Sequence, residues 1–93
     1  MAVVSRDAIN RRMKVVAADV TTTARDRAFP TTVEVEPNSE NGLNEVSYVV
    51  CHELTTYRRA RLDATPIGRL SAMDMWKVEE AILMVIGAKE LPD

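Results

Sequence analysis

The chain has 93 residues, of which 46% are hydrophobic and 28% are charged, and its formal net charge is −2. These values are typical of one globular domain and exclude a disordered chain or a second core. The longest apolar run is too short to cross a bilayer, no secretory signal is recognisable, and a single cysteine cannot form an intramolecular disulfide. We therefore expect one domain over residues 1–93, in a cytoplasmic protein without membrane contact.

The charges are distributed unevenly along the chain. Residues 1–33 contain six basic and three acidic side chains, and residues 58–73 contain four basic and one acidic. Residues 34–57 contain five acidic side chains and no basic ones. If the two basic segments fold onto one face, they form a groove that attracts a polyanion despite the negative total. The alternative, a mosaic of solvated charges, is what charge alone favours.

Short β-strands are predicted through the first two thirds of the chain, because β-branched residues gather in short runs between polar turns. The predicted strands cover residues 2–5, 13–20, 31–36 and 46–52, with one more short edge strand at 64–70. The intervening predictions are a turn or single helical turn at 6–12, a polar loop at 21–30, a turn at Asn41-Gly42 and a loop at Thr55-Thr56-Tyr57.

The last third predicts one helix. Ser71 is a suitable N-cap residue, Gly87 a suitable C-cap residue, and Pro92 prevents continuation. Apolar residues between these ends recur at three- and four-residue spacing, which makes one apolar helix face; they are Met75, Val78, Ile82, Val85 and Ile86. Strands followed by one helix predict a mainly β fold, a small curled antiparallel sheet packed by a C-terminal helix.

Familiar catalytic motifs are missing from the sequence. The glycines are scattered, so no phosphate-binding loop is predicted, and no spacing suits a metal ion or other cofactor. The single histidine, His52, lies between Cys51 and Glu53, whose side chains point to the opposite side of a strand. Cys51 is therefore interpreted as a small buried hydrophobic residue. His52 has two interpretations, a hydrogen-bonded residue at a strand end or a catalytic acid or base.

Two polar clusters are candidates for nucleic-acid binding. The first follows a predicted buried strand and offers hydroxyl and guanidinium groups to phosphate; it consists of Thr21, Thr22, Thr23, Arg25 and Arg27. The second places an aromatic ring beside three cations, which suits single-stranded nucleic acid; it consists of Tyr57, Arg58, Arg59 and Arg61. Each cluster can also be an ordinary solvated loop.

The order of these motifs resembles the MazF/PemK toxins of bacterial toxin–antitoxin systems. The resemblance runs over nearly the whole chain. An apolar strand ends in Ser5, a second closes on Thr21, and a proline precedes an alternating strand at Pro30 to Val35. A loop containing Asn41-Gly42, an apolar strand before His52-Glu53, a basic stretch and the terminal helix complete the order.

This resemblance implies a small SH3-like, partly open antiparallel barrel with a C-terminal helix, acting as a homodimer. It also implies a toxic endoribonuclease that arrests growth by cleaving single-stranded mRNA at a short sequence, independently of the ribosome and of metal ions. In that reaction the ribose 2′-OH attacks the adjacent phosphate and leaves a cyclic phosphate and a 5′-OH end. A cognate MazE-type antitoxin, acidic and disordered when free, is expected to cover the basic groove.

The resemblance also implies site residues. Thr21 matches the threonine that assists catalysis, and the segment matching His52-Glu53 helps to read bases. The sequence begins where the family's Arg-Pro motif should end, so either the chain is a shortened member or another arginine substitutes. The candidates are Arg25, which we take as the catalytic one, Arg27, Arg58 and Arg59. His52-Glu53 also replaces the family's Asp-Gln; the histidine could transfer protons, and an ionised Glu53 cannot donate a hydrogen bond to a base.

Three functions follow from this pattern. The leading hypothesis is the endoribonuclease toxin, with Thr21, Arg25 and His52 as its catalytic residues and both polar clusters binding RNA. The second is a non-catalytic toxin of the same fold that acts by protein binding, as gyrase poisons do, through the helix from Trp76 to Ile86. The third is a structural partner subunit, which predicts no toxicity.

Overall fold

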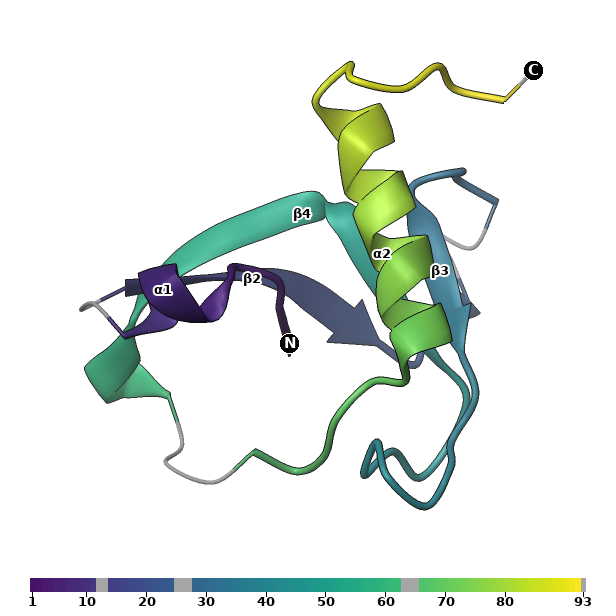
Figure 1. Cartoon of the computed structure of the whole chain (residues 1–93). Coiled ribbons are helices and arrows are strands. Elements are labelled where there is room, and N and C mark those ends of the chain that lie inside the picture. The colour runs from purple at the N-terminus through teal and green to yellow at the C-terminus, as the bar shows by residue number, and fades with distance from the viewer. Residues whose placement is uncertain (12–13, 25–27, 63–65, 93) are drawn as a thin grey trace.

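The structure is a computed structural model that describes residues 1–11, 14–24, 28–62 and 66–92, without the side chains of Ala8 and Arg61. Its main parts are a curved antiparallel sheet and a C-terminal helix (Figure 1). The sheet order is β1-β2-β4-β3. The elements, in chain order, are β1 (Ala2–Val3), α1 (Asp7–Asn10), β2 (Lys14–Thr21), β3 (Thr32–Val35), β4 (Ser47–Arg58), η2 (Arg59–Arg61) and α2 (Ala72–Val85). The predicted fold class is confirmed.

Strand β4 lies between β2 and β3 in the sheet, and it pairs with β2 on both sides of a bulge and with β3 along its first third. Its pairing with β2 is interrupted by a bulge. Ala18 lies opposite Leu54, but the next residue, Asp19, lies opposite Val50, so residues 51–53 of β4 have no opposite residue on β2. Extra residues of this kind bend a strand and turn its side chains. Figure 1 shows the bend in β4, which curls the sheet into a half-barrel.

Helix α2 lies across β3 and the first half of β4 (Figure 1). Its Val78 and Ala81 pack with residues of three strands in one buried cluster, whose other members are Ala18, Val33, Val35, Val49 and Cys51. Most of these side chains are small and β-branched, as expected for the interior of a strongly curved sheet. Because the cluster is closely packed, truncating one of its side chains is expected to lower the free energy of unfolding.

Both ends of α2 agree with the sequence-based expectation. The Ser71 hydroxyl accepts a hydrogen bond from the Asp74 N–H at 3.0 Å, as an N-cap side chain does. After the last turn Gly87 has a φ of 78°, and its N–H donates to the Met84 carbonyl at 3.2 Å. This left-handed conformation ends the helix and favours glycine.

The loop between β3 and β4 is organised by Asn41, which is buried. Its side-chain carbonyl accepts from the N–H groups of Asn38 at 3.2 Å and Leu43 at 3.0 Å, and its amide donates to the Glu36 carbonyl at 2.8 Å. The next residue, Gly42, has a φ of 71° and lies against the backbone of Ile67. The predicted Asn41-Gly42 turn is therefore present, and it holds the segment that leads into α2.

Three sequence-based expectations are wrong. Residues 66–70 form no strand, while 63–65 lie outside the described residues. Residues 55–57 belong to β4 rather than to a loop, because their partners on β2 extend the ladder beyond the bulge. The predicted apolar face of α2 does not bury Ile86, which is 66% exposed. Among the described residues, no helix is both long and apolar enough to cross a bilayer.

Candidate RNA-binding site

Thr21 is the last residue of β2 and lies opposite Tyr48 of β4. Its side chain is half-buried, and its hydroxyl oxygen accepts a hydrogen bond from the Thr23 N–H at 3.1 Å. That bond uses a lone pair of the oxygen, and no group in the described part of the chain accepts the hydroxyl hydrogen, so it can donate to an anion. Because β1 runs antiparallel to β2, with Ala2 opposite Ala18, the N-terminal end of β1 points toward Thr21. Because Thr21 is still paired with β4, the backbone that carries its hydroxyl is held in the sheet, and the hydroxyl is well placed to bind a phosphate.

The rest of the first polar cluster follows Thr21 in the chain. Thr22 and Thr23 are exposed beyond the end of the strand. The two arginines expected to bind phosphate, Arg25 and Arg27, lie outside the described residues. The structure therefore places the hydroxyl groups of this cluster on the surface and leaves the positions of its cations as predictions.

His52 and Glu53 lie in the bulge of β4, and both are exposed. The Nδ1 atom of His52 is 2.7 Å from the hydroxyl of Thr31, which is 8% exposed. The imidazole also faces the ring of Phe29, with 5.3 Å between the ring centroids and 55° between the planes. His52 is hydrogen-bonded, as one interpretation expected, but it lies inside β4 rather than at a strand end. Its catalytic role stays a prediction.

The register separates His52 from Thr21 along β4. Thr21 lies beside Tyr48, four residues before His52 on that strand. At the rise of a β-strand this offset is about 13 Å. A hydrogen bond joins heavy atoms within about 3 Å, so one phosphate bound at Thr21 is out of easy reach of the His52 ring in the same protomer. The register therefore places these two predicted catalytic residues apart along β4.

The second polar cluster lies at the opposite end of the same ladder. Arg58 ends β4 opposite Lys14, the first residue of β2, and Arg59 and Arg61 follow in η2. Lys14, Arg58 and Arg59 have exposed side chains, and Tyr57 is half-buried. Lys14 and Thr21 are seven positions apart along β2, which is about 23 Å of strand. The two clusters therefore lie at opposite ends of the β2–β4 ladder and do not form one site within a protomer.

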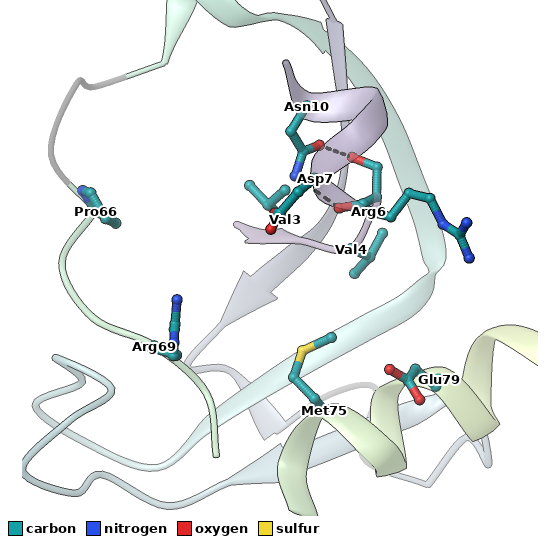
Figure 2. Close-up of a pocket in the computed structure, with 10 residues that line it drawn as sticks. Val3, Val4, Arg6, Asp7, Asn10, Pro66, Arg69, Met75 and Glu79 are labelled. Atoms are coloured by element: carbon teal, nitrogen blue, oxygen red, sulfur yellow. Dashed lines mark hydrogen bonds between the residues drawn. The ribbon is translucent and has the colours of Figure 1, made fainter. Parts of the chain in front are cut away.

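A pocket of about 660 Å³ lies on another part of the molecule, between the N-terminal segment and α2 (Figure 2). Figure 2 shows Arg6, Asp7 and Asn10 on one side and Met75 and Glu79 of α2 on the other. Asn10 hydrogen-bonds Ser5, with its amide donating to the Ser5 carbonyl at 2.8 Å, which fixes the turn after β1. The pocket mixes cations and carboxylates and contains none of the site residues expected from the sequence.

Cys51 is fully buried, and its thiol packs against α2 with Sγ 3.9 Å from the Val78 carbonyl oxygen. Burial raises the pKa of this thiol to about 11, because the interior disfavours the charged thiolate. A thiol in this state is a poor nucleophile at neutral pH. The prediction that Cys51 is a small hydrophobic residue is confirmed, and a Cys51–His52 catalytic pair is excluded.

Cys51 is therefore expected to resist alkylation in the folded protein. Its pKa rises from 9.0 to about 11 on folding, so at pH 8 the folded chain holds about 100-fold less thiolate than the unfolded chain. Iodoacetamide labelling followed by mass measurement should show a slow folded and a fast unfolded reaction. Cysteine placed at the exposed Thr55 in a Cys51→Ala background is the matched control. Equal rates for Cys51 in both states would contradict its burial.

Three residues that lie next to the candidate site residues were not predicted from the sequence. Lys14 joins the second cluster only through its pairing with Arg58. Phe29 and Thr31 reach His52 across twenty-one residues or more of sequence, through the turn before β3. The sequence Phe29-Pro30-Thr31 before an alternating strand does predict a turn. Its contact with His52 could not be predicted, because it depends on the bulge in β4, and no local sequence pattern indicates that bulge.

No group of three or more His, Cys, Asp or Glu residues placed to hold a metal ion occurs among residues 1–11, 14–24, 28–62 and 66–92. The chemistry available at the two clusters is that of hydroxyl, guanidinium, ammonium, imidazole and aromatic groups. These groups recognise phosphates by charge and hydrogen bonds, and they recognise unpaired bases by stacking. The surface is therefore a candidate interface for a single-stranded nucleic acid.

Comparisons with known proteins agree with this description. Residues 1–86 match a family described as the PemK-like, MazF-like toxin of type II toxin–antitoxin systems. The solved Mycobacterium tuberculosis toxin MazF-mt6 is 30% identical with a TM-score of 0.79, covering 92% of this chain and 83% of that one. No curated protein sequence matches this chain.

Two further solved structures are similar. An endoribonuclease in complex with its cognate antitoxin, from a mycobacterial species, is 30% identical with a TM-score of 0.78; the match covers 94% of this chain and 79% of that one. A mycobacterial endoribonuclease is 29% identical with a TM-score of 0.75, and the match covers 98% of this chain and 79% of that one. The half-barrel with one C-terminal helix is thus shared with all three toxins and endoribonucleases.

Proposed function

We propose that this chain, which belongs to the PemK-like, MazF-like toxins of type II toxin–antitoxin systems, is an endoribonuclease that cleaves single-stranded RNA at a short sequence without a metal ion. The observation that carries the proposal is the match over residues 1–86 together with Thr21 at the end of β2, its hydroxyl free to donate. The similar solved endoribonucleases support the same activity.

The proposed reaction needs no group from outside the protein and RNA. The 2′-oxygen loses its proton and bonds to the adjacent phosphorus, and the bond from phosphorus to the 5′-oxygen breaks. The products are a cyclic phosphate and a 5′-hydroxyl; the 2′-proton passes to water and the 5′-oxygen takes a proton from water, so the protons balance. Negative charge grows on the non-bridging phosphate oxygens, where a donated hydrogen bond lowers the barrier. Thr21 supplies that donor in this proposal.

The remaining residues of both clusters are proposed to bind RNA. Arg25 is proposed as the cation at the reacting phosphate, because it follows Thr21 closely in the chain. Thr22, Thr23, Arg27, Tyr57, Arg58, Arg59 and Arg61 are proposed to bind the strand on either side. The offset along β4 favours base contact over proton transfer for His52 at the phosphate held by Thr21, and Glu53 is proposed to bind RNA as well.

Two protein partners belong to the proposal. A second copy of the chain would form a homodimer and bring one copy's Thr21 end within reach of the other's Arg58 end. A MazE-type antitoxin, acidic and disordered when free, would cover the basic residues and block RNA. The mycobacterial endoribonuclease solved with its cognate antitoxin supports this partner.

Expression of the chain in a bacterium tests the proposed function. Growth should stop within a few generations, and cellular mRNA should acquire new 5′-OH ends that share one short sequence. Thr55→Ala, on an exposed threonine outside both clusters, should arrest growth like the wild type. Normal growth with intact mRNA, despite folded protein at the wild-type level, would overturn the proposal.

A second candidate rests on α2, where apolar side chains remain on the surface. Met73 is 61%, Trp76 55% and Ile86 66% exposed. Such a surface suits a non-catalytic toxin that binds a protein target, as gyrase poisons do. Growth arrest that survives Thr21→Ala but is abolished by Trp76→Ala, with intact mRNA, would favour this function over the nuclease.

A further inference from the structure

We propose that Phe29 and His52 together form a platform on which one RNA base stacks, and that Thr31 holds the His52 ring in place for it. This inference rests on the proposed RNA-cleaving function and identifies a specificity-determining surface within it. Neither Phe29 nor Thr31 belongs to the clusters that the sequence pointed to. Both are brought to His52 by the turn that leads into β3.

The turn itself is rigid. The Thr32 N–H donates to the Phe29 carbonyl at 3.1 Å, which closes a β-turn with Pro30 at its second position. Proline fixes its own backbone angle, so the turn has few alternative shapes. The Cys51 N–H then donates to the Thr31 carbonyl at 3.0 Å and fastens the turn to β4. Phe29 and Thr31 are therefore held at a fixed distance from the bulge.

Two contacts from this turn fix the imidazole. Thr31 is 8% exposed, and its hydroxyl lies 2.7 Å from His52 Nδ1. The ring of Phe29 packs against the imidazole at 5.3 Å with a tilt of 55°. A hydrogen bond at Nδ1 sets which face of the ring turns outward and leaves Nε2 as the nitrogen for other partners. The buried threonine thus acts as a positioning residue.

The exposure of the pair points to a ligand. Phe29 is 54% exposed, and it does not belong to the buried cluster formed by α2 and the sheet. An aromatic ring that is held rigidly but left on the surface offers a flat apolar face to an unpaired base, which stacks on it with little sequence preference. The hydrogen-bonding edge of His52 beside it adds discrimination between bases.

Binding of a short single-stranded RNA tests the platform. Every ribose of this RNA carries a 2′-O-methyl group, so no free 2′-OH is present to attack the phosphate. Phe29→Ala is expected to weaken binding about 10-fold, which lies within the usual range for the loss of one base–aromatic stack. Phe29→Tyr should bind like the wild type because it keeps the ring, and Phe29→Leu should bind like Phe29→Ala because it keeps only bulk. Ile67→Ala removes another exposed apolar side chain and should change nothing.

Fluorescence gives a readout that a purely structural role would not move. A Phe29→Trp, Trp76→Phe variant has its only tryptophan at the platform, and its emission should be quenched when the RNA binds. For Thr31, Thr31→Val should weaken binding, Thr31→Ser should keep it, and Thr31→Val should add nothing in a His52→Ala background.

The failure of this inference is separable from that of the proposed function. If wild-type protein cleaves RNA but Phe29→Ala and Phe29→Leu bind as tightly as wild type, the platform is wrong and the nuclease stands. Unquenched tryptophan at position 29 in an RNA-saturated sample leads to the same conclusion. If the wild type neither binds nor cleaves RNA, both proposals fall.

Discussion

Replacing Thr21 by alanine is expected to lower the rate of RNA cleavage by about 10²–10³-fold, the usual cost of one donor to a charge that grows in the transition state. The hydroxyl sits at a strand end, positioned by the Thr23 N–H at 3.1 Å, so little motion is needed to donate to a phosphate. Single-turnover cleavage of a long single-stranded RNA with excess protein measures this rate without product release.

Two controls identify the hydroxyl as the cause. Thr21→Ser keeps a donor at the same place and should retain most of the activity. Thr55→Ala removes an exposed threonine from β4 and should cleave at the wild-type rate. Circular dichroism should show that all variants fold. A folded Thr21→Ala protein that cleaves as fast as wild type would remove Thr21 from the proposed chemistry.

Replacing Gly42 by alanine is expected to have the largest effect on stability. Gly42 has a φ of 71°, and a Cβ placed there would overlap the carbonyl group of Ile67. The left-handed backbone alone costs a non-glycine residue about 1–2 kcal/mol. Overlap with a backbone group adds about 1–3 kcal/mol, because the segment before α2 must move. The total is a large fraction of the stability of so small a domain.

Gly87→Ala is the matched control for Gly42→Ala. Gly87 has a similar φ of 78°, but nothing lies within 4 Å of a Cβ built there. It should therefore show the backbone cost alone, about 1–2 kcal/mol in free energy of unfolding. Guanidinium denaturation at one fixed protein concentration measures both variants. Equal losses would show that the contact between Gly42 and Ile67 does not constrain the fold.

The elements that are readable from the sequence are those whose signals are local. The N-cap at Ser71, the glycine after α2 and the alternation of β3 each depend on a few adjacent residues, and all appear in the structure. The full length of β4 was not readable, since Thr55, Thr56 and Tyr57 resemble a polar loop. They become strand because β2 offers partners as far as Lys14. The exposure of Trp76 likewise depends on which side of α2 meets the sheet.

The residues of the candidate site also fall into those that local sequence patterns predict and those that they do not. Thr21 was predictable because a strand that closes on a threonine is a local pattern and part of a family resemblance. The surroundings of His52 were not predictable. They depend on three residues of β4 that have no opposite residue on β2, and on a turn more than twenty residues earlier. The pairing of Lys14 with Arg58 is also a consequence of register.

The most direct test of the central claim is incubation of the purified protein with a long single-stranded RNA in EDTA, followed by mapping of the new 5′ ends. The account predicts discrete cuts at one short sequence, each with a 5′-OH end and a cyclic phosphate on the other fragment. It also predicts that Thr21→Ala makes the same cuts about 10²–10³-fold more slowly. Intact RNA after incubation with folded wild-type protein, free of antitoxin, would contradict the claim that this chain is a metal-independent ribonuclease.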